Sequence, residues 1–246
     1  MQRINASRTG LQTAFDIAVA PRAALGALRS APTWGWAFVI AAVLAMVSTL
    51  AISPVVGSVF ERELRTQIET APQPAALPPD QRAVLVERQV RFARTAIAFS
   101  FVLVPLGLAA GCALQSLVML IANAIGGGDG TFGKFWALAV NAAVVGSGLA
   151  SVALTAIVLL RGRDGFGSAA QLGNAVPSLG AFVPANAKAA GAFFGALNVF
   201  TLWDGVLLAA GMVVVARLSR ATAVVTALLI VLGTGVFPLA GAALGR

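Results

Sequence analysis

The chain has 246 residues, of which 59% are hydrophobic and 11% are charged, and its mean hydropathy of +0.89 excludes an ordinary soluble domain and predicts a protein embedded in a lipid bilayer. The net charge of +8 comes without a basic patch interleaved with aromatic residues, which argues against nucleic-acid binding and favours loops that face anionic lipid headgroups. Histidine and tyrosine are absent, so histidine-dependent catalysis is excluded.

Residues 1–33 are predicted to form an amphipathic segment that lies in the membrane interface. Apolar residues are mixed with polar and basic ones there, and Pro21 divides the segment into two short helical pieces. A partly disordered tail is the alternative. Four arginines precede the first span, which favours a cytoplasmic N-terminus, although a count of basic residues over all loops does not favour it.

Residues 34–246 are predicted to form one membrane domain, an all-α bundle of about five transmembrane helices. Five apolar runs are long enough to cross a bilayer. They cover residues 34–54, 93–124, 135–160, 192–216 and 221–244. The second run is longer than a span needs, which predicts either a strong tilt or a break near Pro105.

Two segments between these runs are predicted to lie outside the membrane. Residues 57–91 carry charges of alternating sign around a proline-rich centre, which is typical of an aqueous helical hairpin. Its charges are interpreted as solvated helix faces, with partner docking as the less favoured alternative. Residues 161–190 are rich in glycine, proline and asparagine and are predicted to form an irregular loop, with a re-entrant apolar centre as an alternative.

Small residues within the runs predict where helices approach one another closely. They occur at Gly107 and Gly111, along 146–151, and at Gly205 and Gly211.

Asp204 is the residue that most strongly indicates function, because it places a carboxylate inside an otherwise apolar span. Ionisable groups at that depth are costly and usually face a bundle interior. One interpretation is a polar path that Asp204 lines together with Asn198, Asn141 or Asn123. The other is a structural role, in which the carboxylate bonds a nearby hydroxyl or indole group or is hydrated close to the interface.

The glycine-rich turn at 126–134 resembles three known sequence motifs, but its context argues against the function of each one. It matches a dinucleotide fingerprint and approaches a phosphate-binding loop, but a membrane span precedes it and Phe135 replaces the hydroxyl that binds magnesium. Gly126-x-Gly128-Asp129 resembles the signature of intramembrane aspartyl proteases, with Asp204 as the second carboxylate, but its order along the chain makes this a remote alternative. We therefore predict no catalytic, cofactor-binding or metal-ligating residue.

Three segments together resemble the bacterial branch of the Yip (Ypt-interacting protein) membrane-domain family. They read AFDIAVAPRAALGALRSAPTWGWAFVIA, GGGDGTFGKFWALAVNAAVVGSGL and NVFTLWDGVLLAAGMVVVARLSRATA. Family members often carry an acidic residue ahead of the aromatic residues of the last segment. In this chain Asn198 occupies that place, and the acidic residue, Asp204, directly follows Trp203. The residues that carry the resemblance are candidates for structural or interaction roles: Pro21, Gly128, Phe132, Asn198, Phe200, Trp203 and Asp204.

The resemblance implies a non-enzymatic, multi-pass protein of the bacterial inner (plasma) membrane that acts as a scaffold or accessory for other membrane proteins. Eukaryotic members of the family bind small GTPases, and some bacterial relatives are associated with export systems. The expected partners are the bilayer, other membrane proteins such as transporter components, and a second copy of the chain; no nucleic acid and no cofactor is expected. A small transporter or permeation component that uses Asp204 is the alternative.

Overall fold

The computed structural model describes residues 9–70, 78–184 and 187–236, and these residues form helices and loops without a strand. Four helical stretches are long and apolar enough to cross a membrane: Gly35–Thr66, Val102–Gly126, Phe132–Arg161 and Val199–Ala216. The prediction of an all-α fold is confirmed, and the four long apolar helices are compatible with a multi-pass membrane protein. A further apolar helix, Arg220–Thr234, has 15 residues, and the remainder of the predicted fifth span, 237–244, lies outside the described residues.

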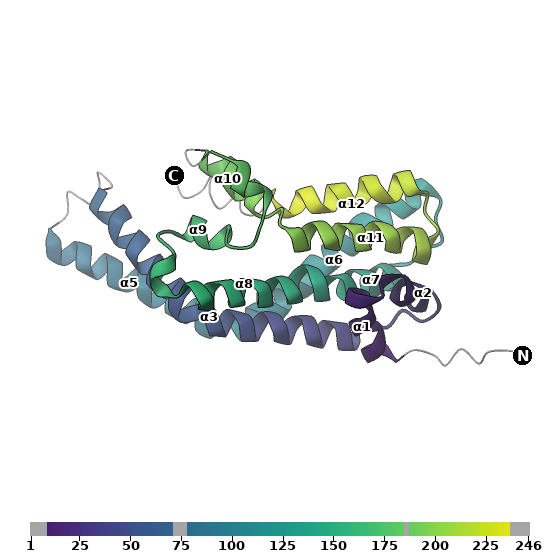
Figure 1. Cartoon of the computed structure of the whole chain (residues 1–246), viewed down its shortest axis with the longest axis horizontal. Helices are drawn as coiled ribbons and strands as arrows, with labels where there is room; N and C mark the ends of the chain where they lie inside the picture. Colours follow the sequence, from purple (N-terminus) through teal and green to yellow (C-terminus); the bar gives the residue numbers. More distant parts are fainter. Residues whose placement is uncertain (1–8, 71–77, 185–186, 237–246) are drawn as a thin grey trace, which may run out of the picture.

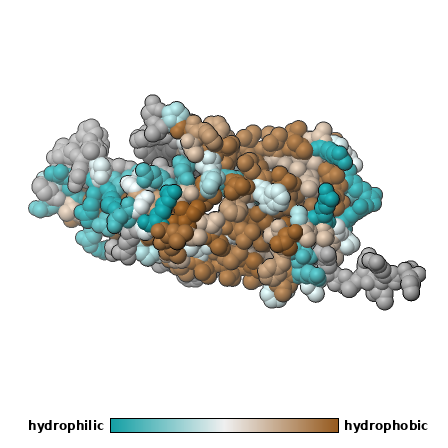
Figure 2. All heavy atoms as spheres, in the orientation of Figure 1, coloured by the Kyte–Doolittle hydropathy of each residue, from teal (hydrophilic) through white to brown (hydrophobic). Residues whose placement is uncertain are grey.

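The long helices lie side by side and form a bundle (Figure 1). Figure 2 shows hydrophobic residues over the middle of this bundle and hydrophilic residues gathered towards both ends, as expected for a membrane-embedded surface. In chain order the helices are α1 (Gly10–Val19), α2 (Pro21–Ser30), α3 (Gly35–Thr70), α5 (Pro79–Ala98), α6 (Ser100–Gly126), α7 (Phe132–Ala143), the π-helix η1 (Val144–Leu149), α8 (Ala150–Arg161), the 3₁₀ turn η2 (Arg163–Gly165), α9 (Ala169–Gly173), the 3₁₀ turn η3 (Leu179–Phe182), α10 (Lys188–Gly195), α11 (Val199–Ala216) and α12 (Arg220–Thr234).

The N-terminal helices α1 and α2 pack onto one end of the bundle rather than lying apart from it (Figure 1). Pro21 begins α2, where its missing N–H costs no helical hydrogen bond. Ile17 and Leu28 are fully buried in the main core, whereas Phe15 and Val19 are exposed on the other face of α1. The predicted division into two helices is confirmed, and α1 has apolar residues on two faces.

Helix α3 joins the predicted first span to the first part of the predicted aqueous hairpin. Pro54 lies inside this helix instead of ending it. Val59, five residues after the proline, packs with Val158 and Phe166 in a second small core, which stabilises the continuation of the helix. The helix has 36 residues, which is about 54 Å at the standard rise per residue and exceeds a hydrocarbon core of about 30 Å. A helix of this length that crosses a bilayer would extend beyond the hydrocarbon core at one end.

The break predicted near Pro105 lies instead at Phe99, between α5 and α6. Phe99 has φ −86° and ψ 0°, and Pro105 is inside α6. A proline within a helix cannot donate to the carbonyl four residues earlier and crowds it. Phe99 lies within one turn of the carbonyl that Pro105 leaves without a donor. The helix is therefore interrupted at Phe99 and not at the proline itself.

The predicted fourth run, 192–216, is also interrupted. Helix α10 ends at Gly195 and α11 begins at Val199, so Asn198 is the N-cap of α11: its Oδ1 accepts hydrogen bonds from the N–H groups of Phe200 at 2.9 Å and Thr201 at 3.1 Å. The predicted irregular loop, 161–190, contains short helical pieces, namely η2, α9, η3 and the start of α10. The capping preference of asparagine, rather than hydropathy, determines where α11 begins.

Candidate functional site

Asp204 lies on the inner face of α11, with 7% of its surface exposed. It faces Gly146 of η1, where an added Cβ would lie 2.8 Å from both Cβ and Cγ of Asp204. The carboxyl group therefore packs directly against the backbone of η1, in space that only glycine leaves free. Its Oδ1 has no hydrogen-bond partner in the described part of the chain. A buried carboxylate oxygen without a partner is costly, which marks this position as a functional candidate.

The helix opposite Asp204 is irregular where the two meet. Val144–Leu149 form a π-helix of 6 residues between α7 and α8. Such widened turns are rare and occur frequently at functional sites. Gly148 of the same turn approaches α3, where an added Cβ would lie 3.2 Å from Cδ1 of Leu44. The small residues of η1 thus allow close contact with α3 on one side and with α11 on the other.

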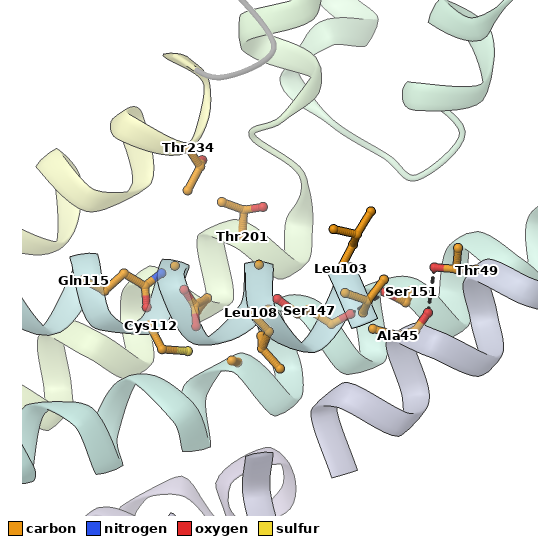
Figure 3. Close-up of a pocket in the computed structure, with 16 residues that line it drawn as sticks. Ala45, Thr49, Leu103, Leu108, Cys112, Gln115, Ser147, Ser151, Thr201 and Thr234 are labelled. Atoms are coloured by element: carbon orange, nitrogen blue, oxygen red, sulfur yellow. Dashed lines mark hydrogen bonds between the residues drawn. The ribbon is translucent and has the colours of Figure 1, made fainter. Parts of the chain in front are cut away.

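Asp204 lines a cavity of about 460 Å³, whose other lining residues come from α3, α6, α7, η1, α8, α11 and α12 (Figure 3). This volume lies in the range of small-molecule sites. Oε1 of Gln115 is likewise buried and without a partner among the described residues. The polar residues that line the cavity besides Asp204 are Thr49, Cys112, Gln115, Ser147, Ser151, Thr201 and Thr234.

Hydroxyl groups around the cavity donate their protons to the backbone of their own segments. The bonds run from Thr49 to the carbonyl of Ala45 (2.8 Å), from Ser151 to Ser147 (2.7 Å), from Thr201 to Ala196 (3.0 Å) and from Thr234 to Val231 (2.6 Å). A hydroxyl that has donated its only proton retains acceptor lone pairs. The cavity is therefore lined with more hydrogen-bond acceptors than donors.

The glycines of α6 do not form the helix contact predicted for them. Gly107 and Gly111 are exposed, and no described atom lies within 4 Å of a Cβ built on either. Because both also line the cavity, the cavity opens to the surface on this side of α6. Close packing is instead found at Gly205, where an added Cβ would lie 2.5 Å from Cγ2 of Val231, and at Gly211 against Leu138.

None of the asparagines proposed as companions of Asp204 is among the described residues that line its cavity, so the cavity does not support that part of the prediction. Asn198 caps α11, and Asn123 bonds the turn after α6. The side-chain amide of Asn141 donates to the carbonyl groups of Thr33 and Ala137, each at 2.8 Å. An amide side chain can bond unpaired backbone groups at helix ends and turns. Asn198 and Asn123 do so at a helix end and a turn, and Asn141 donates to a helical carbonyl.

The alternative structural role of Asp204 is not supported by its neighbours. Thr201 donates its hydroxyl proton to Ala196, and Ser219 lies beyond the far end of α11, where it caps α12. Trp203, next in sequence, is 42% exposed. Asp204 thus faces inward while its tryptophan neighbour faces the exterior.

The other residues singled out from the sequence are distributed over both ends of the bundle. Phe200 packs against the main core near Asp204. Phe132 is 42% exposed and stacks on Trp136, with ring centroids 6.3 Å apart. Gly128 allows the α6–α7 turn to approach α11, since an added Cβ would lie 2.8 Å from the carbonyl oxygen of Ala216. Pro21, Gly128 and Phe132 belong to the end that carries α1 and α2, and the structure does not bring them together with Asp204.

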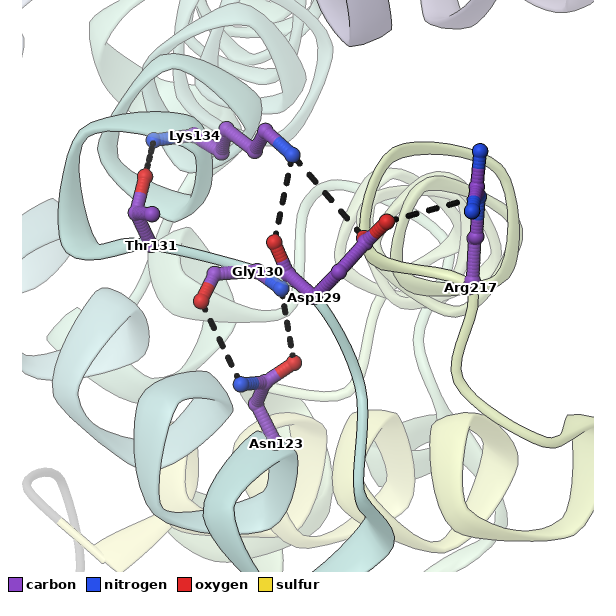
Figure 4. A network of polar contacts seen from close by, with 6 residues as sticks. All are labelled: Asn123, Asp129, Gly130, Thr131, Lys134 and Arg217. Atoms are coloured by element: carbon purple, nitrogen blue, oxygen red, sulfur yellow. Dashed lines mark hydrogen bonds and ion pairs between the residues drawn. The ribbon is translucent and has the colours of Figure 1, made fainter.

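The glycine-rich turn is joined to the turn between α11 and α12 (Figure 4). Asn123 holds Gly130 through two bonds, from the Gly130 N–H to Oδ1 at 3.0 Å and from Nδ2 to the Gly130 carbonyl at 3.3 Å. The N–H of Asp129 donates to Ala216, and its carboxylate lies 3.3 Å from Nε of Arg217. We call this set of contacts the turn lock.

The turn lock also separates the two carboxylates required by the aspartyl-protease hypothesis. Asp129 contacts the C-terminal end of α11, whereas Asp204 lies near the start of that helix. The distance from residue 204 to residue 217 along α11 is about 20 Å at the standard rise per residue. Two carboxyl groups must lie close enough to share a proton to form such a dyad. The structure thus assigns the Gly-x-Gly-Asp segment a structural role.

Replacing Asn123 with alanine is expected to lower the free energy of unfolding by about 1–3 kcal/mol, because the partly buried N–H and carbonyl groups of Gly130 lose their partners. Reversible unfolding in mixed micelles measures the change. Asp129→Asn is the matched control: its carboxylate is 47% exposed, and loss of its ion pairs is expected to cost no more than about 1 kcal/mol. An equal loss in the two variants would show that the charges, not the asparagine, hold the turns together.

Comparison with protein-family models, with curated proteins and with solved structures found no match. Within the residues described, no group of three or more acidic, cysteine or histidine side chains could hold a metal ion. The fold and the site together define a helical bundle with four apolar helices long enough to cross a membrane and a polar cavity around a buried carboxylate. Gln115, a polar residue within an apolar run, is the cavity residue that the sequence could have indicated.

Proposed function

We propose that the protein is a small transporter or permeation component that binds a polar solute within the membrane. One observation carries this proposal: the carboxylate of Asp204 is buried, has an oxygen without a partner among the described residues, and lines a cavity of about 460 Å³. A carboxylate that only stabilised the bundle would be expected to bond another helix. The Asp204 side chain instead lines a space large enough for a small molecule.

A second candidate function is a scaffold or accessory for other membrane proteins, and the projecting part of α3 together with α5 favours it. These helices carry exposed charges, including the i, i+4 pairs Glu61–Arg65 and Glu87–Arg91, each at 2.7 Å. Only a small core containing Leu64 and Val86 lies between them. This arm offers a charged surface for a partner. Under either function, the five-span topology, the resemblance to the Yip family and the bacterial plasma-membrane location remain proposals.

Solute flux in proteoliposomes distinguishes the two functions. Purified protein is reconstituted, and the permeation of glycerol, urea and methylammonium is followed by stopped-flow light scattering. We expect at least one of these solutes to cross faster with the wild-type protein than with Asp204→Asn, by about tenfold or more, since a buried charge–dipole contact contributes about 1.4 kcal/mol or more. Asp129→Asn, which changes an acid outside the cavity, should match the wild type.

The opposite outcome would favour the scaffold. The transport proposal fails if two results are obtained together. Asp204→Asn leaves the flux of every tested solute unchanged. Pull-downs with the wild-type protein recover a defined membrane protein, which is lost when charges of the α3–α5 arm are removed.

A further inference from the structure

We infer that the solute bound in the cavity is an organic cation, with an ammonium group that pairs with Asp204 and an apolar body that contacts the surrounding helices. This inference rests on the proposed function, which it narrows to a class of substrate. Charge, hydrogen-bonding capacity, volume and the position of the opening support it independently.

The charge of the site favours a cation. Asp204 is the only charged residue among the described residues that line the cavity. A buried carboxylate is costly unless a positive group accompanies it. Since the lining supplies neither lysine nor arginine, a cationic solute provides the missing partner. An anionic solute would place two like charges in one enclosed space.

The hydrogen-bonding groups of the cavity favour a ligand that donates. The hydroxyl groups of Thr49, Ser151 and Thr201 donate their hydrogen bonds to backbone carbonyls. Oε1 of Gln115 has no partner within the described ranges. An ammonium group carries three donors and no acceptor. It therefore complements a wall of carboxylate, amide and hydroxyl oxygens. A ligand rich in acceptors would leave these oxygens unsatisfied.

The volume and the apolar part of the lining favour an organic molecule over a bare ion. Leu103, Val104 and Leu108 of α6 line the cavity together with the polar groups. A dehydrated metal ion requires several oxygen ligands at about 2.0–2.6 Å, converging on one point. A space of about 460 Å³ with a wall of aliphatic side chains instead accommodates a hydrocarbon or aromatic group attached to the ammonium.

The opening at Gly107 and Gly111 gives this ligand a route. It lies on α6, whose neighbouring side chains Leu106 and Leu114 are 60% and 52% exposed. Exposed leucines on a membrane-spanning helix face lipid. A cation with an apolar body partitions into the lipid interface and reaches the cavity from that side.

Equilibrium binding of tritiated 2-phenylethylammonium to the full-length protein in lipid nanodiscs tests the inference. We expect saturable binding to the wild type, at least tenfold weaker binding to Asp204→Asn, and unchanged binding to Asp129→Asn. The neutral analogue 2-phenylethanol, of nearly the same shape, should compete at least tenfold less well. Gln115→Leu, which keeps the charge and removes one acceptor, should weaken binding several-fold.

The inference is overturned if folded wild-type protein shows no saturable binding of 2-phenylethylammonium, or if 2-phenylethanol competes equally well. Should Asp204→Asn not fold, as judged by size-exclusion chromatography and circular dichroism, the competition and Gln115→Leu measurements decide the question. The inference and the proposed function fail separately. Solute flux that depends on Asp204, without binding of 2-phenylethylammonium, would retain the transporter and reject the cationic substrate, whereas flux that does not depend on Asp204 would reject the transporter itself.

Discussion

Replacing Gly211 with leucine is expected to destabilise the bundle more than any other single substitution proposed here. Gly211 lies on α11 where it meets α7, and the atoms nearest to an added Cβ all belong to Leu138, with Cγ at 2.9 Å. Leu138 is itself fully buried, so it has no free space to move into. Overpacking a filled core typically costs about 1–3 kcal/mol, and a complete leucine at this contact should reach or exceed the upper limit. Unfolding in mixed micelles, with the monodisperse fraction after extraction, measures the loss.

Two companion variants test the cause of this loss. Gly233→Leu on α12 meets no described atom within 4 Å of its Cβ, so it should retain the stability of the wild type or gain up to about 1 kcal/mol from the higher helix propensity of leucine. Leu138→Ala in the Gly211→Leu background should recover part of the stability, because the two residues compete for one volume. If Gly233→Leu is as damaging, or if Leu138→Ala adds to the damage, the close contact between α7 and α11 is not the reason.

Gly146→Val is expected to abolish the site while leaving most of the bundle assembled. Its Cβ would lie 3.0 Å from Oδ1 of Asp204 and closer still to the carbons of that side chain, so the carboxylate must turn away or η1 must shift. We expect a loss of about 1–3 kcal/mol in stability and solute flux reduced to that of Asp204→Asn. Proteoliposome flux and unfolding in mixed micelles measure the two effects.

Gly107→Ala is the matched control for Gly146→Val, because Gly107 lines the same cavity with no described atom within 4 Å of its Cβ. It should retain the stability of the wild type or gain about 0.5–1 kcal/mol from the higher helix propensity of alanine. Flux that survives in Gly146→Val at wild-type levels would show that the contact between η1 and Asp204 is not needed for permeation.

Hydropathy was sufficient to predict the class of fold, because a bilayer requires long apolar helices whatever their neighbours. It was insufficient for their ends. The first helix continues through Pro54 since residues beyond it pack against Phe166, more than a hundred positions later in the chain. Conversely, α11 begins at Val199, within an apolar run, because Asn198 caps the helix there. Long-range packing in one case and capping in the other overrode the apolar pattern.

The candidate site was predicted in part. A carboxylate within a span indicates a buried functional group on general grounds, and Asp204 is buried. Its surroundings could not be predicted, since Thr49, Gln115, Ser147 and Thr234 come from separate helices and their proximity depends on how the bundle packs. The open space beside Gly107 and Gly111 was missed for a related reason: small-residue spacing is the same whether a neighbouring helix fills the groove or leaves it empty.

The π-helix at 144–149 gives the third membrane helix one more residue than a regular α-helix would need to follow the same path. A chain shortened by one residue within this turn could form a regular helix and keep the faces of α7 and α8 in their present directions. The same deletion elsewhere in α7 or α8 would rotate every later side chain by about 100°. The turn is therefore the place where this helix can change length without changing which residues face the core, although the backbone that meets Asp204 would then move.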